Sequence, residues 1–130
     1  MSRYLLDTNA LLWWLADSPR LGQQARQVLS IEHNEIFVSA AALWEIEIKR
    51  SSGKLHAPLA PQILKELSAY EFHPLPISFD HAIAAGQLPP HHLDPFDRVM
   101  IAQTLIEGLI LISSDQHIPH YNVPHLAADR

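Results

Sequence analysis

Several features are missing from this 130-residue chain, and each absence excludes a kind of site or a class of protein. There is no cysteine, which excludes disulfide bonds and thiolate metal ligands. No apolar run approaches the ~20 residues that a membrane-spanning helix needs. The first residues carry one arginine, Arg3, and then an acid, Asp7, so they do not resemble a signal peptide. We therefore expect a cytoplasmic protein that does not enter a membrane.

Linkers, internal repeats and low-complexity tracts are also missing, and the length fits one domain spanning residues 1–130. Strand-like and helix-like segments alternate, which favours an α/β fold with a parallel sheet. The prolines at 74 and 76 place the third strand at an edge. We expect strands at residues 3–6, 35–38, 72–77, 109–112 and 123–126, and helices at 10–15, 19–30, 40–50, within 58–70, at 79–86 and at 95–107.

Acidic residues lie just past the expected strand ends or on the helices beside them. Asp7 follows the first strand, Glu45 lies in the helix after the second, Asp97 opens the helix before the fourth, and Asp115 follows the fourth. Ligands of open α/β sheets bind beyond the carboxyl ends of the strands, so these acids could share one crevice. Two like charges ~4 Å apart repel by roughly 4 kcal/mol at an effective dielectric near 20. A Mg²⁺ or Mn²⁺ ion would remove that repulsion, and the pattern predicts a metal-dependent phosphoryl-transfer enzyme, foremost a nuclease.

Each acid also has a purely structural interpretation. Asp7 could cap a helix, although Thr8 or Asn9 is the cap we expect for the first helix. Asp94 resembles an N-cap, with Pro95 at the first helical position and Asp97 completing a capping box. Asp115 could cap the turn that follows it, and Glu45 could be exposed and paired with Lys49 at i,i+4.

The net charge of −5 argues at first sight against a nucleic-acid partner. The proposed site, however, holds several of the acids, and a bound metal would offset them. Lys49, Arg50 and Lys54 follow Glu45 closely; they could contact a phosphate backbone, or they could be a solvated helix end favoured by the helix dipole.

The nine histidines raise a zinc hypothesis, because His91-His92 and His117-x-x-His120 have suitable spacing for a ligand pair. No third ligand stands at a recognised interval, so surface or capping roles are favoured. Trp13, Trp14 and Trp44 could stack on RNA bases, but they fall on apolar helix faces and we expect them to pack in the core or a dimer. Leu11, Leu12 and Leu15 in the first of these helices favour an exposed apolar surface that needs a partner.

Three motifs together resemble a family. Leu5-Leu6-Asp7-Thr8-Asn9, Leu43-Trp44-Glu45-Ile46 with Gly53-Lys54-Leu55 after it, and His92-Leu93-Asp94-Pro95-Phe96-Asp97-Arg98 stand in the expected order. They resemble a PIN domain, and more narrowly the VapC-type toxins of bacterial type II toxin–antitoxin systems. The resemblance implies a PIN-like three-layer α/β/α sandwich whose central parallel sheet has strand order 3-2-1-4-5.

The resemblance also implies an Mg²⁺- or Mn²⁺-dependent endoribonuclease. Asp7, Glu45 and Asp97 match the core acidic positions of the family, and Asp115 matches the fourth, with Ser113-Ser114 in place of the usual Thr-Ala lead-in. Asp94 matches a further acid found in one subgroup. Homodimers are typical of the family, as is a cognate antitoxin that lays a peptide segment over the site.

On this hypothesis, Asp7, Asp97 and Asp115 bind the metal, and Glu45 binds metal or orients the attacking water. Hydrolysis leaves 5′-phosphate and 3′-hydroxyl ends. Thr8, Asn9, Ser113 and Ser114 could donate hydrogen bonds to ligands or phosphate, and Arg98 could contact phosphate or pair with an acid. The alternatives are a DNase or phosphatase with the same metal-bound acids, and a non-catalytic RNA- or protein-binding module.

Overall fold

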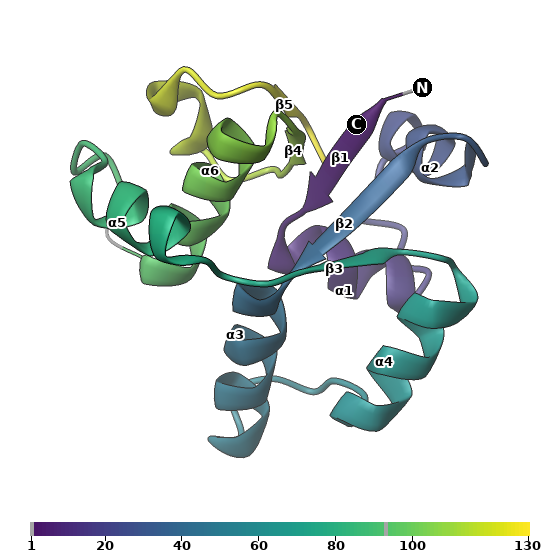
Figure 1. Ribbon diagram of the computed structural model, residues 1–130. Helices are drawn as coiled ribbons and strands as arrows, with labels where there is room; N and C mark the ends of the chain where they lie inside the picture. The colour runs from purple at the N-terminus through teal and green to yellow at the C-terminus, as the bar shows by residue number, and fades with distance from the viewer. Residues whose placement is uncertain (1, 93) are drawn as a thin grey trace.

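The computed structural model describes residues 2–92 and 94–130. Its centre is a five-stranded sheet in the order β3-β2-β1-β4-β5, with every neighbouring pair parallel (Figure 1). Helices flank this sheet, and the chain has the α/β class and strand order that were predicted. The elements in chain order are β1 (Arg3–Leu6), α1 (Thr8–Leu15), α2 (Gln23–Ser30), β2 (Glu35–Ser39), α3 (Ala40–Ser51), α4 (Ala60–Ala69), β3 (His73–Leu75), α5 (Phe79–Gln87), α6 (Pro95–Glu107), β4 (Ile110–Ile112), the 3₁₀ turn η1 (Ile118–Tyr121) and β5 (His125–Leu126).

The two central strands are short and apolar, and they carry the core. Leu5 and Leu6 of β1 are buried, as are Leu111 and Ile112 of β4 beside them. Apolar runs without alternation are typical of parallel strands that helices cover on both faces. The proline-containing β3 lies at one edge, as predicted, and β5 closes the other edge.

Two predictions about helix starts were wrong. The first helix begins at Thr8, and its N-cap is Asp7 rather than Thr8 or Asn9. The second helix begins at Gln23, not at residue 19, because the end of the chain packs against its N-terminus. The backbone N–H of Gln24 donates to the carbonyl of Arg130 at 2.8 Å. Gly22 permits this approach, since a Cβ there would lie 2.1 Å from the same oxygen.

The apolar surface of the chain also differs from the prediction. Leu11 is fully buried, and Leu12, Leu15, Trp13 and Trp14 pack partly buried against the core, so α1 is not the exposed apolar helix. Exposed apolar side chains lie instead on other helices; they include Trp44 on α3, Leu64 on α4 and Phe79 and Ile83 on α5. Within the described residues, no helix has the length and apolar character to span a membrane.

Candidate metal centre

The candidate site lies where β1 and β4 end side by side. Leu6 of β1 pairs with Ile112 of β4, and the next backbone N–H, that of Asp7, donates to the Ile112 carbonyl at 3.1 Å. Ser113 to Asp115 continue from β4 at the same edge of the sheet. The parallel register therefore brings Asp7 and Asp115 together, although 108 positions separate them in the sequence.

Asp7 combines a structural and an electrostatic role. Its Oδ1 accepts a hydrogen bond from the backbone N–H of Ala10 at 2.8 Å, so it caps α1, and the residue is only 7% exposed. Burial raises the pKa of Asp7 to about 6; the hydroxyl of Ser113 and the N–H of Ala10 oppose this rise, while Asp115 and Glu45 add to it. The carboxylate is thus held in place at an energetic cost that a cation would relieve.

Glu45 is not the exposed residue that one interpretation of the sequence allowed. It lies on α3 and is 5% exposed. Its Oε1 accepts a hydrogen bond from Thr8 Oγ1 at 2.5 Å, and its Oε2 accepts one from Lys49 Nζ at 2.6 Å. The hydrogen bond to Glu45 raises the pKa of Lys49, burial opposes the rise, and Asp94 and Asp97 also add to it. Lys49 is therefore the cation that faces this acidic cluster from α3.

Asp94 is the N-cap of α6, as the sequence predicted. Its Oδ1 accepts from the backbone N–H groups of Phe96 and Asp97 at 2.9 and 3.1 Å. A complete capping box would have the Asp97 carboxylate accept from the Asp94 N–H. That N–H instead faces His92 Nδ1 at 3.3 Å, which leaves the Asp97 carboxylate available to the site.

The carboxyl group of Asp97 is strongly perturbed. Burial raises the pKa of Asp97 to about 7, with further increases from Asp94, Glu45 and Asp7, whereas His92 lowers it. These influences connect α6 to both α3 and the end of β1. Acids that are far apart in the sequence therefore share one electrostatic environment, as the metal hypothesis requires.

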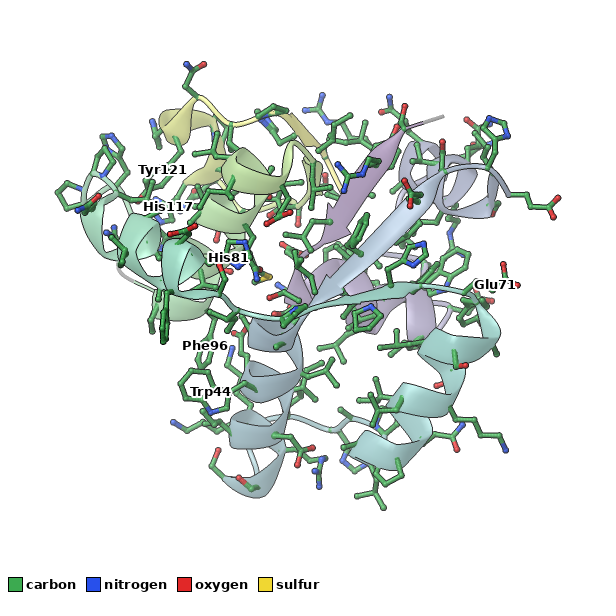
Figure 2. The ribbon with its side chains drawn as sticks, viewed as in Figure 1. Trp44, Glu71, His81, Phe96, His117 and Tyr121 are labelled. Atoms are coloured by element: carbon green, nitrogen blue, oxygen red, sulfur yellow. The ribbon has the colours of Figure 1, made fainter. Side chains whose placement is uncertain are left out.

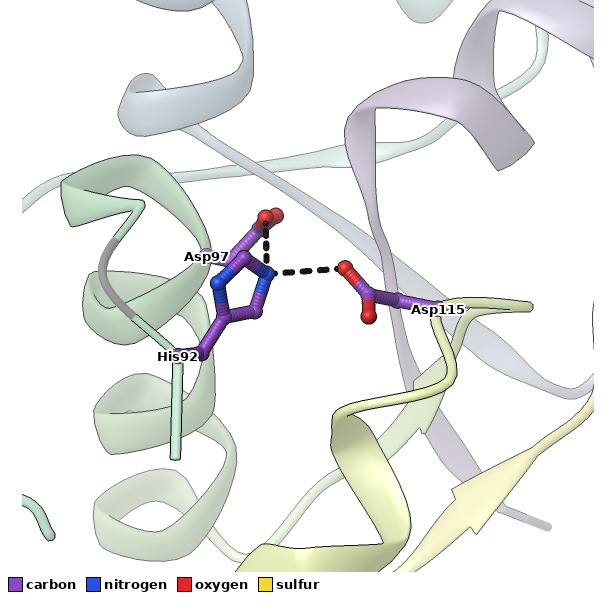
Figure 3. A group of neighbouring side chains, drawn as sticks. All are labelled: His92, Asp97 and Asp115. Atoms are coloured by element: carbon purple, nitrogen blue, oxygen red, sulfur yellow. Dashed lines mark hydrogen bonds and ion pairs between the residues drawn. The ribbon is translucent and has the colours of Figure 1, made fainter. Parts of the chain in front are cut away.

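His92 joins two of these acids and was missed as a site residue in the sequence. Its Nε2 lies 2.9 Å from Asp97 Oδ2 and 2.8 Å from Asp115 Oδ2 (Figure 3). Burial lowers the pKa of His92, but the hydrogen bond to Asp115 and the charges of Asp97 and Asp115 outweigh it, and the net direction is upward. One available signal was its position two residues before the Asp94-Pro-Phe-Asp97 block.

The two histidine pairs meet in space. The rings of His92 and His117 are 4.6 Å apart and those of His91 and His120 are 5.7 Å apart; His117 and Tyr121 are labelled in Figure 2. Among the described residues, however, the one group with metal-ligand spacing is His92 with Asp97 and Asp115. The histidine pairs thus add one imidazole to the acidic site rather than forming a zinc centre of their own.

The smaller neighbours of the acids differ in burial and in hydrogen bonding. Thr8 donates to Glu45, and the Ser113 hydroxyl accepts from the Asp115 N–H at 3.1 Å. Asn9 and Ser114 are exposed. Arg98 donates to backbone carbonyls, those of Ala85, Leu88, Pro89 and His92, at 2.8 to 3.1 Å.

These contacts give Arg98 a structural task, and its contact with a substrate phosphate stays a prediction. Arg98 ties the loop before α6 to α5. Trp44 is 60% exposed, so it does not pack in the core of this chain, and packing in a dimer stays a prediction for it. Its ring meets Phe96 edge-on at 5.2 Å (Figure 2). It is the one of the three tryptophans that is not packed in the core.

The donor set suits a hard divalent cation. Asp97 and Asp115 offer carboxylate oxygens at metal-ligand spacing with His92, and Asp7 and Glu45 lie within electrostatic reach of them. Mg²⁺ and Mn²⁺ prefer such oxygens. Burial, with a smaller effect of the neighbouring acids, raises the pKa of both Asp7 and Asp97, and positive charge close by would favour their ionised forms. The chain is thus an α/β protein with a cluster of acids at the carboxyl edge of its parallel sheet.

Comparison with known proteins identifies the family of this chain. A family model of the PIN domain matches residues 4–124, and the chain therefore belongs to the PIN domain family. The protein named ribonuclease VapC22, from Mycobacterium tuberculosis, is 28% identical over 127 residues, which is 95% of each chain.

Solved structures share the fold. A chain of VapBC2 from Rickettsia felis, bound to a DNA fragment of its promoter, has a TM-score of 0.71 at 15% identity and covers 95% of this chain and 97% of its own. A chain of a toxin–antitoxin complex from Klebsiella pneumoniae has a TM-score of 0.64 at 18% identity and covers 96% and 97%. At these identities the likeness establishes the architecture alone.

Proposed function

We propose that this chain is a divalent-metal-dependent endoribonuclease that acts as the toxin of a type II toxin–antitoxin pair. The observation that carries the proposal is the convergence of Asp7, Glu45, Asp97 and Asp115 at one edge of the sheet. Two of these carboxyl groups have raised pKa values, which is typical of functional sites. Similarity to a protein named ribonuclease VapC22 supports RNA as the substrate, and the likeness to a chain of a toxin–antitoxin complex supports the toxin role.

The residues of the site fit Mg²⁺ or Mn²⁺. Asp7, Asp97 and Asp115 would hold the ion, and Glu45 and Asp94 lie close enough to influence it electrostatically. When bound, the ion supplies positive charge that makes water more acidic and stabilises negative charge on the phosphate.

The side chains of the protein supply orientation. Thr8 and Lys49 each hold one oxygen of Glu45. This fixed orientation supports a role for Glu45 in orienting the attacking water or accepting its proton. Lys49 lies beside the same acids and is half-exposed, which suits contact with a substrate phosphate. Attack by water leaves a 5′-phosphate and a 3′-hydroxyl and does not need the ribose 2′-hydroxyl.

The toxin role implies partners. We expect an antitoxin that covers the acidic centre with a peptide segment; a cationic side chain in that segment would match the confined carboxylates. We also expect a homodimer, because Phe79 and Ile83, one helical turn apart on α5, are 89% and 58% exposed. Apolar side chains so exposed on one helix face favour burial against a second chain.

The test is to express the protein and its Asp7→Asn variant in bacterial cells and to map the 5′ ends of cellular RNA. We expect growth arrest and new 5′-phosphate ends with the wild type, and neither with Asp7→Asn, whose fold is checked by its thermal unfolding. Purified protein should cleave RNA rather than DNA oligonucleotides in Mg²⁺ and lose this activity in EDTA. Full cleavage in EDTA, or by Asp7→Asn, would refute the proposal.

A further inference from the structure

His92 lies between two acids that come from different elements. Its Nε2 contacts Oδ2 of Asp97, on the first turn of α6, and Oδ2 of Asp115, after β4, at 2.9 and 2.8 Å (Figure 3). These are hydrogen-bond distances for a nitrogen donor and a carboxylate. One ring nitrogen therefore fixes the separation of two groups that belong to opposite sides of the site.

The other ring nitrogen indicates where the hydrogen is. The backbone N–H of Asp94 points at Nδ1 of His92 at 3.3 Å, so Nδ1 is the acceptor and Nε2 carries the hydrogen. In this tautomer Nε2 donates to the two carboxylates and has no lone pair to offer a metal ion. The histidine is thus placed as a donor to the acids and not as a third ligand.

The position of the ring is built into the fold. The backbone N–H of His92 donates to the Tyr121 hydroxyl at 2.6 Å, and its carbonyl accepts from Arg98 at 3.1 Å. Tyr121 in turn donates to the carbonyl of Pro89 at 2.9 Å. η1 and α6 therefore both hold the backbone of His92, and a rotation of its side chain would break the ring contacts with Asp97, Asp115 and the Asp94 N–H.

The contacts of His92 leave the carboxylate oxygens able to bind an ion. Asp115 receives His92 on Oδ2 and the backbone N–H of His117 on Oδ1, the latter at 2.8 Å, and each carboxylate oxygen has a second lone pair. Hydrogen bonds from a neighbouring group to ligating carboxylates are a common means of orienting them in metal centres.

We propose that His92 is a positioning residue of the metal centre, which holds the carboxylates of Asp97 and Asp115 in the arrangement that receives the divalent ion. The inference rests on the proposed metal-dependent function, but it concerns a residue outside the set of acids. Loss of an outer hydrogen bond of this kind typically weakens metal binding 10- to 100-fold. His92 therefore determines affinity for the ion without contacting it.

The test uses Mn²⁺ alone as the probe, titrated calorimetrically into the full-length protein at pH 8. His92→Phe removes the donor and keeps a ring, and His92→Gln keeps an amide N–H that reaches the position of Nε2. Both substitutions produce a neutral side chain, so the comparison between them isolates the hydrogen bond from the charge. His120→Phe, an exposed histidine of the same surface, is the matched control.

We expect His92→Phe to bind Mn²⁺ 10- to 100-fold more weakly than the wild type, and His92→Gln to recover at least ~10-fold of that loss. His120→Phe should bind as the wild type does, and Mn²⁺ in the wild type should show no electron-spin-echo coupling to an imidazole nitrogen of His92. If His92→Phe is unstable in EDTA, His92→Ala takes its place in the same comparison.

Two results would overturn the positioning role. Equal or tighter Mn²⁺ binding by His92→Phe would make the histidine a bystander or a competitor of the ion. An imidazole nitrogen coupling that disappears in His92→Gln would make it a direct ligand. If the wild type binds no Mn²⁺ at all, the proposed function fails together with this inference; if the wild type binds and Asp7→Asn does not, only the role of His92 is at issue.

Discussion

Removing the charge of Asp7 should stabilise the metal-free protein and should also abolish RNA cleavage. The pKa of Asp7 is raised from 3.8 to about 6, so the folded state binds its proton more tightly than the unfolded state does. The stabilisation from this proton is greatest below pH 3.8 and is lost as the pH rises through about 6. Above that pH, the buried anion destabilises the fold by about 3 kcal/mol, because one pKa unit corresponds to ~1.4 kcal/mol.

Asp7→Asn eliminates this penalty and keeps an oxygen that can cap α1. In EDTA at pH 7.5 we therefore expect the free energy of unfolding to increase by up to about 3 kcal/mol, which for a domain of this size raises the melting temperature by on the order of 10 °C. The gain should shrink to roughly half of this value at pH 5 and to a small fraction of it at pH 4.

The assay is urea unfolding followed by circular dichroism at these three pH values, with EDTA throughout. Asp129→Asn, which changes an exposed acid, is the control and should shift stability by less than ~0.5 kcal/mol at every pH. A lower stability of Asp7→Asn than of the wild type at pH 7.5, or a gain that does not depend on pH, would show that the charge of Asp7 does not destabilise the fold.

Three further predictions concern the same architecture. Mn²⁺ affinity should fall at least ~10-fold between pH 8 and pH 6, because protons compete for Asp7 and Asp97 with pKa values of about 6 and about 7; calorimetry at each pH checks this, and a flat profile contradicts it. Thr8→Val should cost ~1–3 kcal/mol of stability and slow cleavage, because Glu45 loses a buried donor; unfolding and single-turnover assays measure both, and unchanged values would show that the contact is dispensable. Phe79→Glu should convert a dimer into a monomer in light scattering with little change in melting temperature, because its side chain is 89% exposed; a dimer that persists would place the interface elsewhere.

The sheet was predictable because the signals that mark its strands lie within the strands themselves. The apolar runs of β1 and β4 and the prolines at the edge strand β3 led to the parallel sheet, and the resemblance to PIN domains supplied the strand order that the structure has. The start of α2 could not be predicted, because it depends on the approach of Arg130, which is distant in the sequence. The cap of α1 was misassigned because Asp7, Thr8 and Asn9 are all good capping residues, and local preference does not choose among them.

The site was predictable in part for the same reason. Asp7 follows β1 directly and Asp115 comes three residues after β4, so their meeting follows from the parallel register of the two strands. The role of His92 needed a tertiary contact: it intercepts the Asp94 N–H that a capping box would use, and this frees Asp97. Arg98 stands in a motif that suggests catalysis, yet its guanidinium holds the backbone carbonyls of the preceding loop, a pattern that spacing alone does not reveal.

Binding of Mg²⁺ and Mn²⁺ to the purified protein decides whether the gathered acids form a metal site. Isothermal titration at pH 8 should show a saturable site for Mn²⁺ in the wild type, which Asp7→Asn and Asp97→Asn lose while both remain folded. Wild-type protein that cleaves RNA but takes up no divalent ion, or variants that bind Mn²⁺ as well as the wild type, would contradict the account.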